Sequence, residues 1–376
     1  MGHIKDLRDR PSGYQGDRPY WARYRDALGK EHGKTFRTKR EAQGWLAENE
    51  VARQRGDWVD PRSGKVAFET FAEEWRAVQV HRPTTAGQVE TNFRVHVYPV
   101  LGRRAIASIR PSHVQGMIKA LSLELAPGTV ETIYRHVAAV FKAAARDRVI
   151  SRSPCEGITL PKQERDDHVI PLTVDQVHAV AQLLPERWQA AVWLGAGTGL
   201  RQGEVLGLTV DRVDFLRRSV KVDRQLVTPN RGAPRLSPPK TKASYRTVPL
   251  PDSTGFLLAE HIRRFPPVDD LIFTMEDGRP IRRSRMGEAW RRAADRAGLP
   301  ERTGFHATRH FYASLLIQHG ESVKVVQNRL GHASAMETLD TYGHLWPDSE
   351  DATRDAVDSV LGNLAGWTLD ADAVEG

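Results

Sequence analysis

A set of basic residues and one tyrosine lies in five ordered segments of the C-terminal half of the chain. These segments are Thr198–Leu206, Pro239–Arg246, His306–His310, Leu330–His332 and Thr341–His344. Arginine binds phosphate oxygens through two parallel hydrogen bonds, and lysine or histidine can carry a proton to or from a reacting group. A tyrosine hydroxyl can serve as a nucleophile. The set therefore has the residue types needed to break and rejoin a phosphodiester bond.

Two other motifs suggest cofactors, but neither is complete. Gly195–Gly199 is glycine-rich, yet Leu200 stands where a nucleotide-binding fingerprint needs glycine or alanine, and no βαβ pattern surrounds it. His306 and His310 have the i, i+4 spacing of metal ligands, but no glutamate follows the first histidine and the sequence has a single cysteine. A complete phosphate-loop pattern does not occur either. We therefore expect no metal, nucleotide or other cofactor.

Together and in this order, the five segments resemble those of the tyrosine recombinases, the phage-integrase family. The resemblance implies a catalytic set made of Arg201, Lys240, His306, Arg309, His332 and Tyr342. Glu204, three residues after the first arginine, matches the acidic residue that the family usually has there. The family cleaves DNA without metal or ATP, so the implied cofactor list is empty.

The roles that the resemblance implies suit these residue types. Arg201 and Arg309 are expected to neutralise the charge that grows on the nonbridging phosphate oxygens. Tyr342 is expected to attack the phosphorus and to hold the DNA 3′-phosphate. The 5′-oxygen is a poor leaving group unless it is protonated, and Lys240 on its hairpin is expected to supply that proton.

The resemblance gives the two remaining histidines separate tasks. His306 is expected to accept a proton or a hydrogen bond near the nucleophile. His332 is expected to donate a hydrogen bond to a nonbridging oxygen. We interpret His310, His319 and His344 as neighbours typical of the family or as surface residues, without a catalytic role.

Each assignment also has a plain structural alternative. Arg201 could simply pair with Glu204 on one face of a helix. Lys242 lies two residues from Lys240 in the same loop, although the spacing typical of the family favours Lys240. Tyr342 could be a packed aromatic residue whose hydroxyl is hydrogen-bonded.

Helices and strands must position these residues. The pattern of the sequence predicts an α+β fold that is mainly α with small β-sheets. In residues 1–65, Pro19–Phe36 reads as two short strands, and Thr38 with Glu41 forms a capping box that begins a helix. We predict a small sheet-plus-helix domain here. The resemblance implies that it is an arm-type DNA-binding domain.

Residues 66–160 are predicted to form a helical-bundle core-binding domain. Apolar residues recur at helical spacing in Phe68–Trp75, Val89–Val97, Pro111–Leu121 and Thr129–Ala145. The proline-containing, charged segment that follows is typical of an interdomain linker.

Residues 168–365 are predicted to form a mostly helical catalytic domain with a small antiparallel sheet, and residues 366–376 a tail. Ser219–Leu226 and Tyr245–Leu250 alternate as strands around a polar hairpin loop. The predicted last helix, Asp351–Leu364, has an apolar stripe made of Val357, Val360, Leu361 and Leu364. The resemblance implies that this helix docks on a neighbouring protomer, and a place in the core of its own chain is the alternative.

The charge of the chain favours a polyanionic partner. The 376 residues include 55 Lys or Arg and 47 Asp or Glu, a net charge of +8. Residues 1–65 hold 15 of these basic and 10 of these acidic residues, which places +5 of the total in that end. A hydrophobic content of 40% excludes a disordered chain, and no apolar run approaches the ~20 residues of a membrane span. One cysteine and no visible signal peptide favour a cytoplasmic location.

The resemblance implies a site-specific DNA recombinase, the integrase of a phage or integrative element, that works through a 3′-phosphotyrosine. The implied partners are double-stranded DNA with core-type and arm-type attachment sites, and three further copies of the chain in a homotetramer on that DNA. A directionality factor or a host DNA-bending protein would be an accessory partner, and no membrane partner is expected. The alternatives are an Xer-like resolvase or transposon recombinase, a type IB topoisomerase, and a non-catalytic DNA-binding regulator.

Overall fold

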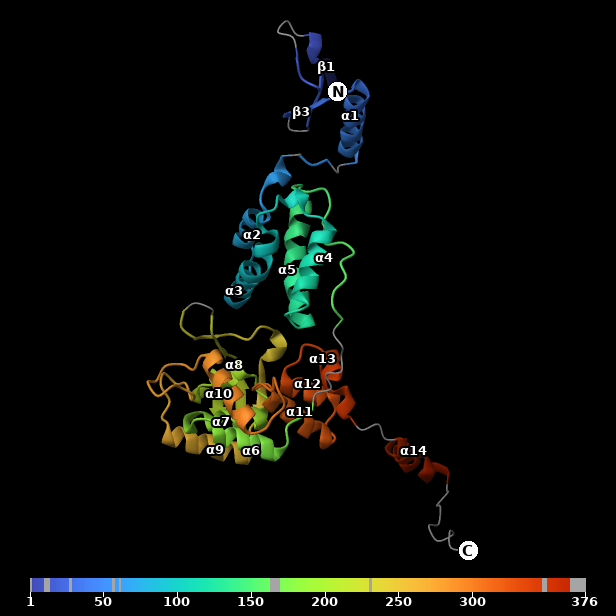
Figure 1. Ribbon diagram of the computed structural model, residues 1–376. Helices are drawn as coiled ribbons and strands as arrows, with labels where there is room; N and C mark the ends of the chain where they lie inside the picture. Colours follow the sequence, from blue (N-terminus) through green and yellow to red (C-terminus); the bar gives the residue numbers. More distant parts are fainter. Residues whose placement is uncertain are drawn as a thin grey trace. The chain divides into compact units, whose positions relative to one another are not determined.

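The chain divides into two compact units, Met1–Gln163 and Glu164–Gly376. The computed structural model describes residues 2–9, 14–26, 29–55, 58–60, 62–162, 170–229, 232–346 and 350–365. Both units consist mainly of helices, and their small sheets are antiparallel, as Figure 1 shows. The predicted fold class is confirmed.

The first unit begins with a three-stranded sheet and one helix. The elements are β1 (His3–Asp6), η1 (Leu7–Asp9), β2 (Tyr20–Arg25), β3 (Glu31–Phe36) and α1 (Lys39–Gln54), and the strand order is β1-β2-β3. Thr38 accepts a hydrogen bond from the backbone N–H of Glu41, which completes the predicted capping box at the start of α1. The strand β1 was not predicted, because its four residues include a single apolar side chain.

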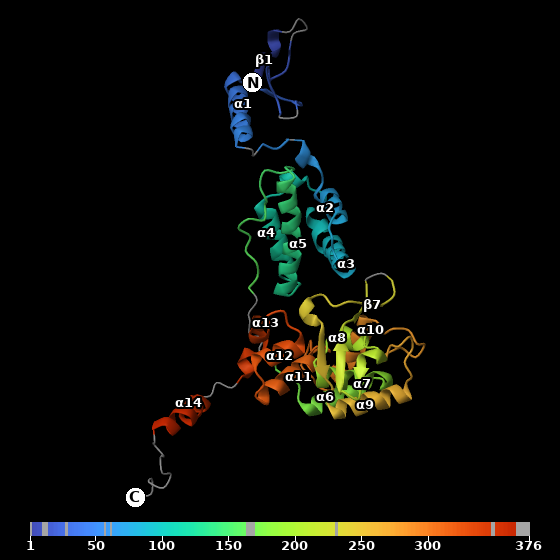
Figure 2. The same cartoon turned by 180° about the vertical axis from the view of Figure 1, so that it is seen from behind.

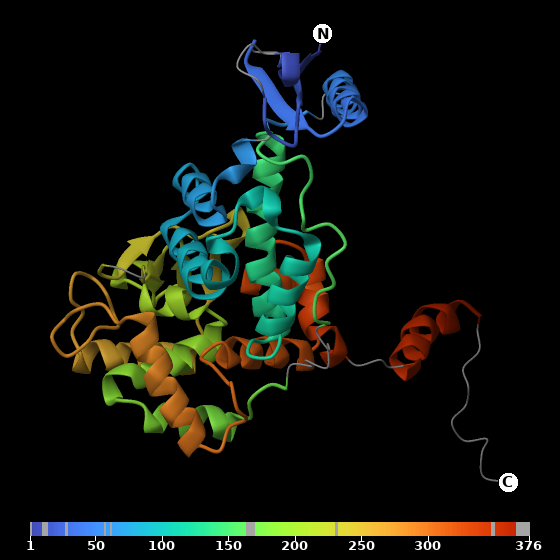
Figure 3. The ribbon, with the colours of Figure 1, turned by 45° about the horizontal axis from the view of Figure 1, so that its top comes forward.

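A helical bundle follows in the same unit. Its elements are η2 (Ser63–Lys65), α2 (Phe68–Ala77), α3 (Pro83–Asn92), the π-helix η3 (Phe93–Gly102), η4 (Ile106–Ser108), α4 (Pro111–Leu121) and α5 (Pro127–Arg146). Figure 3 shows α4 and α5 alongside each other. The core is aromatic at its centre, where Phe68 packs on Phe93 and Phe141, all fully buried. Three of the four predicted helices are confirmed as α2, α4 and α5, and the second, Val89–Val97, falls across the end of α3 and the start of η3. Helix α3 begins earlier because Pro83 occupies its first turn.

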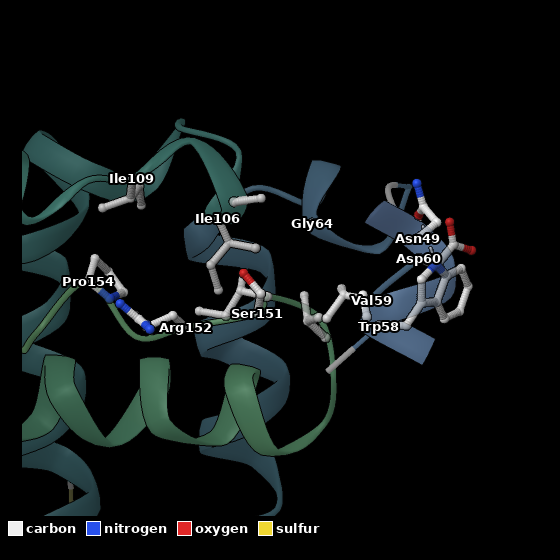
Figure 4. Close-up of a pocket in the computed structure, with 14 residues that line it drawn as sticks. Asn49, Trp58, Val59, Asp60, Gly64, Ile106, Ile109, Ser151, Arg152 and Pro154 are labelled. Carbon is white, nitrogen blue, oxygen red and sulfur yellow. Dashed lines mark hydrogen bonds between the residues drawn. The ribbon is translucent and has the colours of Figure 1, made fainter. Parts of the chain in front are cut away.

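The segment between α1 and α2 packs against the bundle. Ser63 Oγ donates to the carbonyl of Val149 at 3.2 Å, and Gly64 lies against Ala107 where a Cβ would clash at 2.4 Å. A pocket in this region is lined by Asn49, Trp58, Asp60, Ile106, Arg152 and neighbouring residues (Figure 4). The predicted domain boundary near residue 65 stays a prediction.

The second unit holds the five candidate segments. Its helices are α6 (Val174–Leu183), α7 (Glu186–Thr198), α8 (Gln202–Leu206), η5 (Val210–Arg212), η6 (Lys242–Ser244), α9 (Asp252–Arg264), α10 (Arg283–Arg296), α11 (Ala307–Gln318), α12 (Val323–Leu330), α13 (Ala335–Tyr342), η7 (Gly343–Leu345) and α14 (Glu350–Ala365). Its strands are β4 (Val213–Asp214), β5 (Ser219–Val222), β6 (Gln225–Val227), β7 (Arg235–Ser237) and β8 (Arg246–Pro249). The core is formed by helices such as α7, whose Val192 and Leu194 are fully buried.

The predicted strand Ser219–Leu226 is wrong in its extent. The structure divides it into β5, which pairs with β8, and β6, which pairs with β7 in a separate two-stranded sheet. The break falls at Asp223 and Arg224, whose side chains bond to each other, and Asp223 also accepts from Arg212 at 2.8 Å. This polar cluster replaces the alternation that a continuous strand requires.

Helix α13 begins three residues before the predicted start. Ser334 Oγ accepts a hydrogen bond from the backbone N–H of Glu337 and so caps a helix that ends at Tyr342. The helices α11, α12 and α13 contact one another in sequence, as Figure 2 shows. The end of α13, which carries the candidate nucleophile, is therefore held by neighbouring helices.

Helix α14 confirms the predicted last helix. Val357, Val360 and Leu361 on it are 49%, 62% and 55% exposed, so this part of the apolar stripe is not covered by the chain's own core. The side chain of Leu364 and the predicted tail 366–376 lie outside the described residues. Among the described helices, none has the length and apolar character needed to cross a bilayer.

Candidate active site

Arg201 is placed by a sharp turn between two helices. Helix α7 ends at Gly199, which has φ +65°, and a Cβ there would lie 2.4 Å from the ring of Tyr312. Arg201 then begins α8. Its Nη1 donates to Glu204 at 3.2 Å, and its Nη2 donates to the carbonyl of Gly331 at 3.4 Å. The Arg201 side chain is one-third exposed, so it is accessible from solvent.

Glu204 is buried beneath Arg201 and joins it to Arg246. Arg246 Nη2 and Nη1 donate to the two carboxylate oxygens of Glu204 at 2.8 and 3.2 Å. Burial raises the pKa of Glu204, but the hydrogen bonds and charge of Arg246, together with Arg201, outweigh this effect and leave the pKa lowered. The ionised carboxylate thus holds two guanidinium groups.

Arg309 lies on α11 and is almost completely buried. Its Nη1 donates to the carbonyl of Gly199 at 2.8 Å, and its Nη2 donates to the carbonyl of Leu330 at 2.7 Å. Burial, then the positive charges of Arg201 and Arg246, lowers the pKa of Arg309 to about 9, which still leaves it charged at neutral pH. Arg201 and Arg309 therefore bind two successive carbonyls of the turn that ends α12.

His332 follows that turn directly. Gly331 has φ +66° and ends α12, and the His332 side chain then bonds to Thr338 Oγ1 through Nδ1 at 2.8 Å. Burial, then Arg309 and Arg201, lowers the pKa of His332 to about 3. Its ring stacks on Tyr342, with ring centres 6.4 Å apart. The other nitrogen, Nε2, remains for a bond to a ligand or to Glu337, which is 3.8 Å away.

Tyr342, the last residue of α13, is 1% exposed and its hydroxyl bonds to a histidine. The Oη atom lies 2.8 Å from Nδ1 of His310, a residue to which the sequence assigns no catalytic role. Burial raises the pKa of Tyr342 to about 12, against the opposing charges of Arg309 and Arg201. His306, which the resemblance places near the nucleophile, packs edge-to-face on His310 at 4.7 Å and is exposed.

Lys240 lies on the exposed segment between β7 and η6. The η6 turn that follows packs against Gly331, because a Cβ on that glycine would come 2.9 Å from the carbonyl oxygen of Ala243. Lys242 begins η6 and is exposed as well. The hairpin thus reaches the same α12 turn that both arginines bind.

Five of the six predicted residues therefore meet around the end of α12 and α13, and Lys240 lies on the hairpin beside them. The sequence did not predict that His310 contacts Tyr342 or that Arg246 pairs with Glu204. The i, i+4 pair of histidines was a visible signal, but the contact of His310 with Tyr342 spans 32 residues and leaves no local pattern. Within the described residues, no group of three or more His, Cys, Asp or Glu side chains could hold a metal ion.

Comparison with known protein families matches two domains of the chain. The Phage integrase family model matches residues 171–348, and the Phage integrase central domain model matches residues 68–159. A tyrosine recombinase XerC-like protein of Caldanaerobacter subterraneus subsp. tengcongensis is 28% identical over 86% of this chain and 90% of its own. The integrase of Mycobacterium phage D29 is 24% identical over 80% of this chain and 83% of its own.

Solved structures share the fold. The Tn1549 transposon integrase in complex with circular intermediate DNA has a TM-score of 0.66 at 21% identity, covering 79% of this chain and 100% of that one. A lambda integrase tetramer bound to a Holliday junction has a TM-score of 0.58 at 18% identity, covering 84% of this chain and 94% of that one. The two family matches together cover more than half of the sequence, so the chain belongs to the phage integrase family and is a tyrosine site-specific recombinase.

Proposed function

We propose that this recombinase is the integrase of a phage or integrative element and that Tyr342 is its nucleophile. One observation carries the assignment of the site. Arg201 and Arg309 bind the adjacent carbonyls of Gly331 and Leu330, and His332, the next residue, stacks on Tyr342. Two guanidinium groups, a histidine and a phenol thus converge, which suits phosphoryl transfer to tyrosine.

The proposed roles follow from charge and position. Arg201 and Arg309 neutralise the nonbridging oxygens, and His332 donates to one of them through Nε2. Tyr342 forms the 3′-phosphotyrosine that conserves the energy of the broken bond, so the strand is rejoined without ATP. Lys240 on the hairpin protonates the departing 5′-oxygen. His306 contacts His310 and lies at the edge of this group of proposed catalytic side chains.

The proposed partner is double-stranded DNA, bound by three parts of the chain. Residues 1–65 bind arm-type sites, residues 66–160 bind core-type sites, and residues 168–365 hold the catalytic site. Four protomers act together, with a directionality factor or host DNA-bending protein as accessory, in the cytoplasm. The lambda integrase tetramer on a Holliday junction supports the assembly by analogy, and the exposed Val357, Val360 and Leu361 offer a surface for contact between protomers.

A trapping experiment tests the site assignment. The protein is incubated with a nicked suicide duplex that carries its core site, and the covalent adduct is separated by denaturing electrophoresis. The wild-type chain should form the adduct, and Tyr342→Phe should bind the duplex without forming it. Tyr245→Phe is the matched control, because Tyr245 is half-exposed in the hairpin region and should leave the adduct unchanged. An adduct formed by Tyr342→Phe would place the nucleophile elsewhere.

A second function uses the same chemistry. The XerC-like relative and the Tn1549 fold match favour an Xer-like resolvase or a transposon recombinase. Plasmid substrates separate the possibilities. Joining of two different attachment sites supports integration, resolution of two identical sites supports an Xer-like activity, and relaxation of a plasmid without sites would indicate a topoisomerase.

A further inference from the structure

The nucleophile of this site is held by a histidine that the family resemblance leaves without a role. Tyr342 Oη and His310 Nδ1 are 2.8 Å apart, and the two rings meet at 62° with centres 5.6 Å apart. We infer that His310 is a catalytic residue, the group that accepts the proton of the Tyr342 hydroxyl during attack on the DNA phosphorus. This inference rests on the proposed function, in which Tyr342 is the nucleophile.

The geometry at the start of α11 separates the functions of His306, Arg309 and His310. Arg309 donates its hydrogen bonds to the carbonyls of Gly199 and Leu330. His306, at the residue before the helix, meets the pair through an edge-to-face contact with His310. His310 is four residues further along, on the same face as His306 and directly at the phenol. Of these two histidines, His310 is the one that bonds to the reacting oxygen.

Burial and the charge of Arg309 keep the His310 ring neutral and therefore able to accept a proton. The other titratable groups around it are His306 just before the helix, Tyr342 on α13 and His332 after α12, and Arg201 and Glu337 act on Tyr342. Burial, then Arg309, lowers the pKa of His310 to about 4. At neutral pH its Nδ1 has a free lone pair if the other nitrogen carries the hydrogen.

The hydroxyl, in contrast, keeps its proton until attack begins. With a pKa of about 12, only about one Tyr342 side chain in 10⁵ is ionised at pH 7. As Oη bonds to phosphorus, its O–H bond breaks and the proton moves to His310 Nδ1. The P–O5′ bond breaks in the same displacement, and the 5′-oxygen takes a proton from Lys240. The bound phosphate brings negative charge next to Arg201 and Arg309, which raises the proton affinity of His310 when it is needed.

The test measures adduct formation against pH with single-turnover suicide substrate. In His310→Asn, the amide oxygen can take the place of Nδ1 and accept the hydrogen bond, but it cannot take the proton. The wild-type rate should be nearly independent of pH between 6 and 9, since His310 is neutral throughout. His310→Asn should be roughly 100-fold slower at pH 7, and its rate should rise about tenfold per pH unit, because hydroxide must remove the proton. A sulfur-substituted 5′ leaving group should not rescue it.

The two histidines that flank α11 provide controls. His319→Asn, at the exposed C-terminal end of α11, should retain the wild-type rate and profile. His306→Asn should keep a flat profile whatever its rate. DNA binding by band shift verifies that each variant is folded, and His310→Gln replaces His310→Asn if the latter does not bind.

The outcomes separate this inference from the function on which it rests. A flat pH profile in His310→Asn, or a tenfold slope in His306→Asn instead, would overturn the role of His310. An adduct formed by Tyr342→Phe would overturn the proposed nucleophile. A slope in His310→Asn together with no adduct in Tyr342→Phe supports both.

Discussion

Arg246 donates hydrogen bonds to both carboxylate oxygens of Glu204, and the side chains are only 6% and 3% exposed. Through Nε, Arg246 also donates to the carbonyl of Arg329 near the end of α12, at 2.8 Å. Glu204 in turn bonds to Arg201. One buried ion pair therefore connects strand β8, which follows the lysine hairpin, with Arg201 and with the turn before His332.

We expect Glu204→Gln to destabilise the protein strongly. Removing one partner of a buried ion pair leaves the other charge unpaired, which typically costs about 3–5 kcal/mol. Urea unfolding at pH 7 should show a decrease of that size in the free energy of unfolding. Glu260→Gln is the matched control, because Glu260 pairs with Arg263 on an exposed helix surface and should change stability little. Equal losses in both variants would contradict the role of the buried pair.

The same pair predicts how stability depends on pH. The pKa of Glu204 is lowered in the folded chain, so its stabilising effect is fully present above the pKa of an unfolded glutamate, near 4.3. The effect is lost as the pH falls from there through the lowered folded pKa. The difference in unfolding free energy between wild type and Glu204→Gln should thus be constant from pH 5 to 8 and decrease below about pH 4. A difference that grows on acidification would contradict this.

Gly331→Ala should impair the site more than Gly320→Ala, which introduces similar backbone strain. Gly331 has φ +66°, and a Cβ there would lie 2.9 Å from the carbonyl of Ala243 and 3.1 Å from Arg246 Cδ. Gly320 has φ +78° and open space around it, so Gly320→Ala measures the strain alone, on the order of 1 kcal/mol. Thermal unfolding and adduct formation should show a larger loss for Gly331→Ala. Equal effects would mean that the contact with the hairpin is unimportant.

Local signals in the sequence predicted much of this fold. The capping box of Thr38 and Glu41 begins α1 as predicted, because a cap depends on neighbouring residues only. The family pattern predicted residues that the structure brings together from α8, α11 and α13. These predictions needed no knowledge of distant contacts.

Contacts between distant segments could not be predicted in this way. The bond of Arg246 to Glu204 spans 42 residues, and that of His310 to Tyr342 spans 32. The division of Ser219–Leu226 into β5 and β6 depends on which partner each half finds across the hairpin. Each outcome is decided by tertiary packing and not by the local period of apolar residues.

Residues 1–57 should be needed for integration but not for cleavage. Their positive charge predicts phosphate contacts, and the β1–β3 sheet predicts groove contacts with a second class of DNA site. A chain that begins at Trp58 keeps the packing of Ser63 and Gly64 on the bundle. It should cleave a core-site suicide duplex at a near wild-type rate and fail in full integration. Full integration by this truncated chain would contradict an arm-binding role.

The last prediction distinguishes Lys240 from Lys242, which are both exposed on or next to the η6 turn. The 5′-oxygen leaves as an alkoxide whose conjugate acid has a pKa far above neutrality, so it needs a proton in the transition state. A sulfur atom at the 5′-bridging position leaves as a much less basic thiolate and needs no acid. Lys240→Ala should therefore be severely slowed on ordinary DNA and largely rescued on the sulfur-substituted strand.

Two controls complete this experiment. Arg201→Ala should remain impaired on both substrates, because the charge on the nonbridging oxygens must still be neutralised when sulfur leaves. Lys242→Ala should resemble the wild type on both. If sulfur rescued Lys242→Ala and not Lys240→Ala, the general acid would be Lys242, and the hairpin would have to present η6 itself to the leaving group.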